Sequence, residues 1–171
     1  MSVHSTNRSA GRPLYTPEQR KRRDETHWTL VQAILAPLQF VVFLISLGLV
    51  IWYLSTGDGL LAADLSIIVK TFLLYTIMIT GAVWEKVVFG RYLFADAFFW
   101  EDVFSFLVLA FHTAYLLASF GGLLAPVSLM WLALAAYATY VINAGQFILK
   151  LRMARQQSAG YTLPSGVEVA P

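Results

Sequence analysis

Two things are scarce in this sequence, cysteine and charge. No cysteine is present, which excludes a disulfide framework, a thiolate metal site and a cysteine nucleophile. Charged residues make up 13% of the 171 residues and hydrophobic residues 58%, whereas roughly 25% charged residues are typical of soluble domains. So little charge cannot cover the surface of a soluble globule. The composition argues against a cytosolic enzyme, a nucleic-acid-binding protein and a disordered chain, and it favours a membrane protein.

Long apolar runs indicate where the chain crosses the membrane. Residues 28–54 and 103–149 carry no charged side chain, and residues 65–84 carry only Lys70. The longest run exceeds one span, and a glycine pair and Pro126 divide it in two. Asp64 and Asp96 precede apolar runs and are expected to be helix N-caps. We therefore expect an all-α integral membrane four-helix bundle with spans at about 28–54, 65–88, 97–119 and 126–151.

The basic residues predict how these helices are oriented. Eleven of the twelve Lys and Arg lie before the first span, between the second and third spans, or after the fourth. The positive-inside rule places these segments in the cytoplasm and predicts an N-in, C-in topology. Residues 1–27 are then a basic cytoplasmic tail with a short interfacial helix, 28–155 the membrane domain and 156–171 a disordered cytoplasmic tail. The twelfth cation, Lys70, is expected to extend its ammonium group to the outer interface.

Polar side chains inside the spans are costly in lipid and are therefore candidates for function. They gather in the predicted cytoplasmic half, whereas the outer half is almost entirely apolar apart from Lys70 and some hydroxyls. This asymmetry predicts a cavity for a large apolar ligand, open to the cytoplasmic leaflet, rimmed by carboxylates and floored near His112. Such a site suits general acid–base catalysis. The candidates in the spans are Gln39, Glu85, Lys86, Glu101, Asp102, His112, Asn143 and Gln146.

Structural explanations of the same residues stay open at this point. Carboxylates near helix ends can reach water or form ion pairs, as Glu85 can with Arg91. Asn143 and Gln146 can hold helices together through interhelical hydrogen bonds. A haem-binding bundle is a further alternative, but His27 and His112 are predicted to lie at different depths, which disfavours two axial ligands from them.

Four segments of the chain resemble one known family. They are LYTPEQRKRRDETHWTLVQAILAPLQF at 14–40, YTIMITGAVWEKVVFGRYLF at 75–94, FFWEDVFSFLVLAFHTAYL at 98–116 and YVINAGQFILKLR at 140–152. These segments closely resemble the 3-vinyl bacteriochlorophyllide hydratase family, whose members are small membrane proteins of phototrophic bacteria. The resemblance covers about residues 14–155, and the string WEKVVFGRYLF followed by FFWEDVFS is its most specific part.

The resemblance implies a reaction, a substrate and a location. Members of the family add water to the C3-vinyl group of a chlorin or bacteriochlorin and produce a 3-(1-hydroxyethyl) group. The implied substrate is chlorophyllide a or 3-vinyl bacteriochlorophyllide a, and the implied location is the bacterial inner, intracytoplasmic membrane. No metal or redox cofactor is expected, because the magnesium belongs to the substrate. Lipid is an expected partner and nucleic acid is not.

Hydration of a vinyl group needs a proton for the terminal carbon and a base for the attacking water. We expect Glu101 or Glu85 to be the proton donor and Asp102 to be the base or its orienter. His112 is expected to be a proton shuttle or an axial ligand to the substrate magnesium. The remaining candidates would orient water or ring substituents (Gln39, Asn143 and Gln146) or meet the substrate propionate (Lys86, Arg91 or Lys150).

A non-catalytic pigment-binding or assembly protein of the photosynthetic membrane is the main alternative. It would also need an apolar slot and a magnesium ligand, but not a cluster of acids around them. Four helices barely enclose a tetrapyrrole, so a homo-oligomer or lipid is expected to complete the slot.

Overall fold

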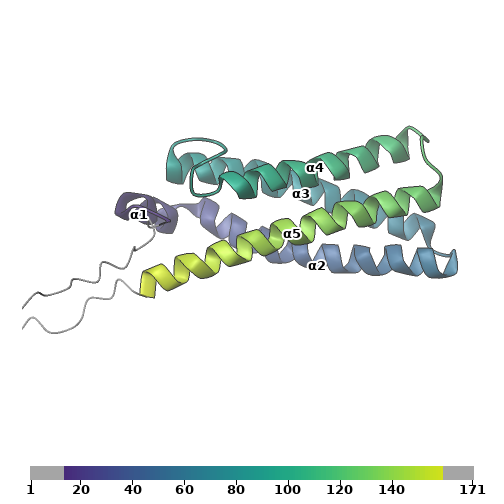
Figure 1. The fold of residues 1–171 in the computed structure, drawn as a ribbon, viewed down its shortest axis with the longest axis horizontal. Coiled ribbons are helices and arrows are strands. Elements are labelled where there is room, and N and C mark those ends of the chain that lie inside the picture. Colours follow the sequence, from purple (N-terminus) through teal and green to yellow (C-terminus); the bar gives the residue numbers. More distant parts are fainter. Residues whose placement is uncertain (1–13, 160–171) are drawn as a thin grey trace, which may run out of the picture.

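The computed structural model describes residues 14–159, the last four by their backbone alone, and this part of the chain is helical without any strand. A short helix precedes four long ones that are apolar enough to span a membrane. The helices are α1 (Pro17–Glu25), α2 (His27–Thr56), α3 (Leu60–Phe89), α4 (Phe99–Phe120) and α5 (Pro126–Ala159) (Figure 1).

The predicted spans overlap the four long helices one to one, but the helix starts and the end of α5 differ from expectation. α3 begins at Leu60, so Asp64 lies inside the helix and is not its N-cap. α4 begins at Phe99 without a side-chain cap, and Asp96 instead lies 3.5 Å from Arg91. α5 continues to Ala159, so residues 156–159, expected to be disordered, are helical. The remaining predicted tail segments, 1–13 and 160–171, lie outside the described residues.

The four long helices run antiparallel to their chain neighbours and form two tightly packed hairpins, α2–α3 and α4–α5 (Figure 1). The turn between α2 and α3 is short because two glycines in it have left-handed backbones, Gly57 and Gly59. A Cβ atom on Gly59 would lie 2.7 Å from the Trp52 ring, so the turn also needs the missing side chain there. We call this end of the bundle, with the 121–125 connection, the far end. The other end carries α1, the 90–98 connection and the last turns of α5, and we call it the basic end.

Two separate apolar clusters stabilise the bundle. The larger fills the interior from the far end to the middle of the bundle, where helical stripes such as Phe43 and Val50 of α2 meet Tyr137 and Tyr140 of α5. The smaller lies at the basic end, where Phe98 contacts Tyr15, Trp84 and Phe89 through ring–ring packing. This second cluster attaches the start of the described chain and the 90–98 connection to the ends of α3 and α5.

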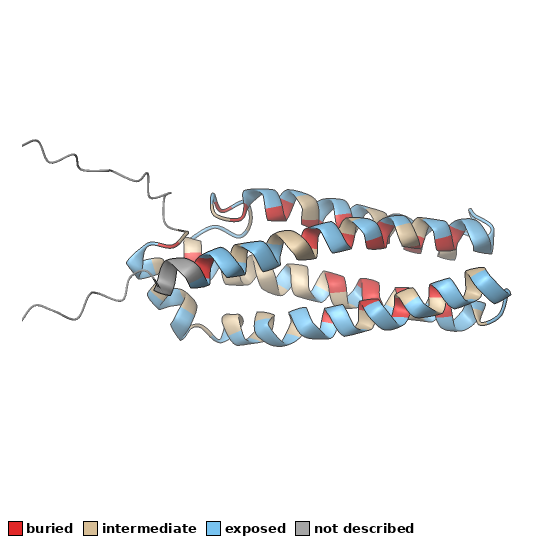
Figure 2. Cartoon of the chain, turned by 60° about the horizontal axis from the view of Figure 1, so that its bottom comes forward, coloured by how far each residue is buried: buried red, intermediate tan, exposed pale blue. Residues whose placement is uncertain are grey.

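The interior between these two clusters is covered less completely. Over residues 27–38 of α2, 75–84 of α3 and 144–153 of α5 no side chain is fully buried, whereas α4 keeps a buried stripe through this level (Figure 2). That stripe is polar for most of its length: Glu101, Asp102, Ser105 and His112 belong to it. The fold therefore places a polar layer between two apolar ones, in the half of the bundle nearer the basic end.

Candidate active site

The 90–98 connection folds back onto the bundle and delivers two consecutive backbone N–H groups to two carboxyl groups. The N–H of Phe94 donates to Asp102 Oδ2 at 2.6 Å, and the N–H of Ala95 donates to Glu85 Oε2 at 3.2 Å. Phe94 has a φ of 58°, a left-handed conformation that bulky residues rarely adopt. Its ring stacks on Phe106 at 5.6 Å, which helps to hold this strained backbone in place.

Three carboxyl groups from two helices converge beneath this connection. Glu85 comes from the last turns of α3, while Glu101 and Asp102 come from the first turn of α4, and each residue is 6% exposed or less. Glu85 and Asp102 lie close enough to interact directly, and Glu101 is close enough to both to interact electrostatically. Ionised carboxylates that share an apolar site repel one another, so a proton between two of them is favoured over ionisation of both.

Glu101 differs from the other two acids in its partners. Its Oε1 lies 3.2 Å from Lys150 Nζ of α5, whereas its Oε2 is buried without a hydrogen-bond partner. One turn further along α4, Ser105 Oγ accepts a hydrogen bond from the Asn143 side-chain amide at 3.0 Å. Asn143 Oδ1 and Gln146 Oε1 of α5 are also buried without partners. This side of the layer therefore offers three unused acceptors around an ion pair.

His112 and Gln39 lie deeper, on the far side of the polar layer. His112 is fully buried, its Nδ1 donates to the carbonyl of Val108 at 2.8 Å, and its Nε2 has no partner. Gln39 is 2% exposed, and neither its amide oxygen nor its amide nitrogen has a partner. About 16 Å along α4 separates Glu101 from His112, since the two are eleven residues apart. The structure thus aligns these groups along one interior path but not around one point.

Lys70 is where the sequence-based expectation fails most clearly. The residue is completely buried, and its ammonium group lies 3.6 Å from the centre of the Tyr140 ring. It does not reach the outer interface, because α3 begins five residues earlier than expected and Lys70 lies on the inward stripe with Ile67 and Leu74. The spacing of that stripe, i, i+3 and i+7, was the signal that could have shown it.

The far half is also more polar than expected. Asp64 of α3 accepts hydrogen bonds from Tyr115 and Ser119 of α4, and Ser46 of α2 is hydrogen-bonded to Tyr137 of α5. Lys70 and some hydroxyls were expected as exceptions in this half, but Asp64 was expected to be an N-cap and not an acceptor between helices. These bonds tie the two hairpins together at the far end, and the four-residue spacing of Tyr115 and Ser119 was the available hint.

Two other candidates lie outside the interior. Lys86 extends its ammonium group to the carbonyl of Gly90 at 2.8 Å, and Arg91 contacts the Phe94 carbonyl at 3.2 Å and the exposed Asp96. Both side chains therefore stabilise the ends of the 90–98 connection. The structure does not bring them together with the buried acids.

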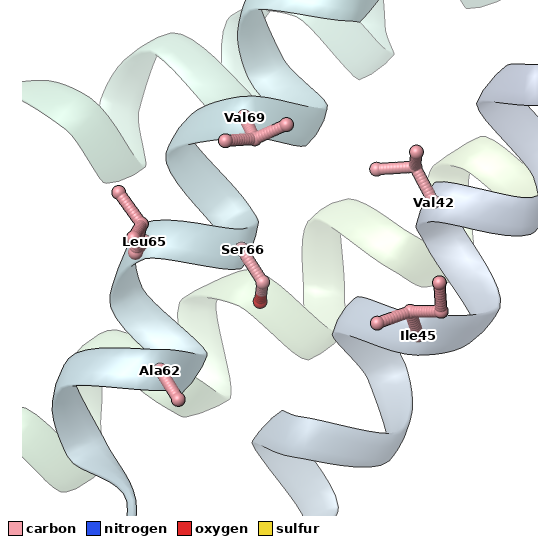
Figure 3. Close-up of a pocket in the computed structure, with 6 residues that line it drawn as sticks. All are labelled: Val42, Ile45, Ala62, Leu65, Ser66 and Val69. Atoms are coloured by element: carbon pink, nitrogen blue, oxygen red, sulfur yellow. The ribbon is translucent and has the colours of Figure 1, made fainter.

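The cavity expected at the acids is closed in this structure, because the unpartnered polar atoms around it are sealed from solvent. A shallow groove of about 360 Å³ lies elsewhere, between α2 and α3 toward the far end (Figure 3). It is lined by Val42, Ile45, Ala62, Leu65, Ser66 and Val69, and none of the candidate residues faces it. Within residues 14–159 no group of three or more His, Asp or Glu side chains has an arrangement suited to a metal ion.

Comparison with known proteins identifies the family. The family model described as 2-vinyl bacteriochlorophyllide hydratase matches residues 15–153. The chain belongs to this family. A 2-vinyl bacteriochlorophyllide hydratase of Cereibacter sphaeroides is 74% identical over 145 residues, which cover 84% of this chain and 89% of that protein. Another from Rhodobacter capsulatus is 69% identical over 147 residues, 85% of each chain. No solved structure matches the chain.

The match to the 2-vinyl bacteriochlorophyllide hydratase family spans all four long helices and the whole polar layer. The family resemblance expected from the sequence is therefore confirmed.

Hydrogen exchange tests how the 90–98 connection of this family member is held. We expect Asp102→Ala to speed exchange at the Phe94 amide by at least about tenfold, because an N–H loses a charged or strongly polar acceptor worth about 1.5 kcal/mol or more. Exchange mass spectrometry of peptides covering the connection measures this. Asp96→Ala is the matched control, since the Asp96 side chain is 98% exposed and binds no backbone amide. Equal exchange in the two variants would show that the carboxyl does not hold the connection.

Proposed function

We infer that this chain is a hydratase that acts on the vinyl group of a bacteriochlorophyllide precursor. The observation that carries this conclusion is 74% and 69% identity to two proteins of that name over most of their lengths. The enzyme is a multi-pass membrane protein, as its four long apolar helices indicate.

We propose that both termini face the cytoplasm, in the inner membrane of a phototrophic bacterium. Support comes from the basic end, which carries α1 with Arg20, Lys21, Arg22 and Arg23, the connection with Arg91, and the last turns of α5 with Arg152 and Arg155. The far-end turns, 57–59 and 121–125, carry no Lys or Arg. Positive charge of this kind is retained on the cytoplasmic side.

The Glu85–Asp102 pair is the proposed proton donor. Both carboxyl groups are buried in the apolar interior, where a proton between them relieves their repulsion, and the backbone N–H groups of Phe94 and Ala95 fix both in place. A positioned acid of this type contributes about 10²–10⁴-fold to a proton transfer. We assign Glu85 as the group that protonates the terminal vinyl carbon and Asp102 as its orienter.

Glu101 is the proposed base for the attacking water. Its Oε1 is paired with Lys150, whereas its Oε2 has no partner and is the free acceptor on this side of the layer. Asn143 Oδ1 and Gln146 Oε1 supply further acceptors that would position a water molecule beside it. The acid and the base thus come from different faces of the same polar layer.

The steps balance without an external reagent. Glu85 gives a proton to the terminal CH₂ of the vinyl group, and the π electron pair forms the new C–H bond. The inner carbon becomes a cation that the macrocycle delocalises, and water adds to it as Glu101 removes a proton. That proton returns to the Glu85–Asp102 pair before the next turnover. The product is a 1-hydroxyethyl group, and no electron carrier is called for because carbon is neither oxidised nor reduced overall.

His112 is the proposed axial ligand to the substrate magnesium. Its Nδ1–H is fixed by the Val108 carbonyl, so the lone pair of a neutral ring lies on the unpartnered Nε2. This tautomer and ring orientation suit a metal ligand. The magnesium here is part of the substrate macrocycle.

Substrate entry requires the hairpins to separate, because the site atoms are closed to solvent. The incomplete coverage over 27–38, 75–84 and 144–153 supports separation near the basic end, where a flat substrate would replace few packed side chains. The far end is held by the Asp64–Tyr115 and Ser46–Tyr137 hydrogen bonds.

Replacing either proposed proton-transfer group tests the mechanism. We expect Glu85→Gln and Glu101→Gln each to lower kcat by at least about 100-fold, because an amide neither donates nor accepts the required proton. The assay follows conversion of a 3-vinyl chlorophyllide in membranes to a product heavier by one water. Glu25→Gln on the exposed surface of α1 is the control and should retain full activity. Near-normal conversion by both variants would refute these assignments, and pigment binding without a mass gain in the unaltered chain would indicate a pigment carrier.

The proposed topology is testable because the chain has no cysteine of its own. Asp58→Cys introduces a thiol in the far-end turn, and Asp96→Cys introduces one in the 90–98 connection, both at exposed positions. In spheroplasts we expect a membrane-impermeant maleimide to label the first variant, and to label the second after the membrane is opened. The reverse labelling pattern would place the termini outside.

Ligation by His112 has a spectroscopic signature. We expect His112→Ala to shift the visible absorption bands of the bound vinyl pigment, since the axial ligand of its magnesium is lost. His27→Ala, at the exposed start of α2, should leave the bands in place. An unchanged spectrum and rate for His112→Ala would rule out the ligand assignment.

A further inference from the structure

Lys70 is a buried ammonium group without an acceptor. It is completely buried at the middle of the bundle, and Nζ makes no hydrogen bond within the described residues. Its neighbours are aromatic faces: the ring centres of Tyr140, Phe43 and Tyr137 lie 3.6, 5.6 and 5.8 Å from Nζ. Cation–π contacts offset part of the cost of burying a charge, but they satisfy none of its three N–H donors.

No acid in the described residues neutralises this group. The ion pairs among the described residues involve other cations, and Asp64, a half-buried acid of the far half, is already bonded to Tyr115 and Ser119. The Gln39 amide is also unpartnered and lies one helical turn from Phe43, on the same face of α2. A buried amino group without an acceptor is costly in a membrane, and Gln39 leaves further hydrogen-bonding capacity unused in the same part of the interior. An anion from outside would be the acceptor that Lys70 lacks.

The other cations near the site are already occupied. Lys150 is paired with Glu101, Lys86 with the Gly90 carbonyl, and Arg91 with the Phe94 carbonyl and Asp96. Each of these cations has at least one partner, whereas a buried substrate carboxylate is bound best by a donor without a competing partner. Lys70 has that donor and lies in an apolar setting where a charged hydrogen bond is strong.

We propose that Lys70, assisted by the Gln39 amide, binds the propionate carboxylate of the tetrapyrrole substrate. The inference rests on the proposed function. Lys70 and Glu85 are fifteen residues apart on α3, about 22 Å along its axis, and the two long side chains shorten the gap between their end groups. The two long side chains and a substituted tetrapyrrole between them together would fill this length, with the propionate at Lys70 and the vinyl group at Glu85. The substrate then enters carboxylate first, with its vinyl group at the acids and its ring against Phe43 and Tyr140.

The test compares a free-acid substrate with its ester in the full-length chain. We expect the unaltered enzyme to have a KM for chlorophyllide a at least about tenfold lower than for its methyl ester, because the ester cannot form the charged pair. Lys70→Met should raise the KM of the acid to that of the ester, with kcat changed by a few-fold at most. Lys21→Met, which removes an exposed lysine of α1, is the matched control and should keep the preference.

The outcomes separate this proposal from the proposed function. Equal KM values for acid and ester in the unaltered enzyme, or a preference that survives Lys70→Met, would overturn the assignment while hydration itself stands. If Lys86→Met loses the preference for the acid over the ester and Lys70→Met keeps it, the substrate carboxylate binds at the basic end. That outcome would also overturn the assignment to Lys70. If the unaltered chain yields no hydrated product, the proposed function fails, and pigment titration with acid and ester still tests Lys70.

A second variant and a competing carboxylate serve as controls for this comparison. If Lys70→Met does not accumulate in membranes, Lys70→Gln carries the same measurement with a polar side chain of similar size. Laurate, a carboxylate of lipid type, is titrated as a competitor. Competition by laurate with an intact acid–ester difference supports the proposal. Laurate binding that depends on Lys70, together with equal affinity for acid and ester, would assign the site to a lipid carboxylate and overturn it.

Discussion

A membrane leaves a protein no water with which to satisfy buried polar groups, and this constraint explains most of the polar contacts of the bundle. Asp64 accepts hydrogen bonds from two hydroxyl groups of α4, and the hydroxyl of Ser46 is hydrogen-bonded to that of Tyr137 on α5. Glu85 accepts a hydrogen bond from a backbone N–H of the 90–98 connection. Where that rule is broken, the exceptions lie along one interior path. Gln39, Lys70, Glu101, His112, Asn143 and Gln146 each keep a buried polar atom without a partner. Unmet hydrogen-bonding capacity of this kind is expected at a site that receives a polar ligand.

The same carboxyl groups serve the fold and the proposed chemistry. Phe94 keeps a left-handed backbone because its N–H reaches Asp102 and its ring stacks on Phe106. The connection in turn limits the positions of Glu85 and Asp102, which would otherwise be flexible side chains near helix ends. A strained residue next to candidate catalytic groups is the usual arrangement when surrounding packing determines the geometry of a site.

Much of this architecture could be predicted from sequence, since the number of long helices and the residues of the polar layer follow from charge-free runs and helical spacing. Lys70 was misplaced because α3 was expected to begin five residues later than it does, and the turn geometry of Gly57 and Gly59 decides where it begins. The stripe of Ile67, Lys70 and Leu74 was the sequence signal for its inward position. The far-end hydrogen bonds were missed because hydroxyls look unremarkable in an apolar run. The cavity at the acids was expected to be open, whereas the structure closes it. The sequence shows which side chains share a helical face, but not how closely the helices pack and exclude solvent from them.

The order in which the helices are joined has a mechanical consequence. α2 is joined to α3 at the far end, α3 to α4 at the basic end and α4 to α5 at the far end, whereas no short connection bridges α2 and α5 at either end. Along this seam the contacts involve Phe43 and Ser46 of α2, and from there to the basic end the side chains of α2 are exposed or half-buried except for Gln39. The two hairpins are joined only through the α3–α4 connection, so α2 and α5 form the unconnected edge of the bundle. α2 and α5 can separate along this edge without stretching any connection. A flat ligand could then enter between them laterally from the lipid.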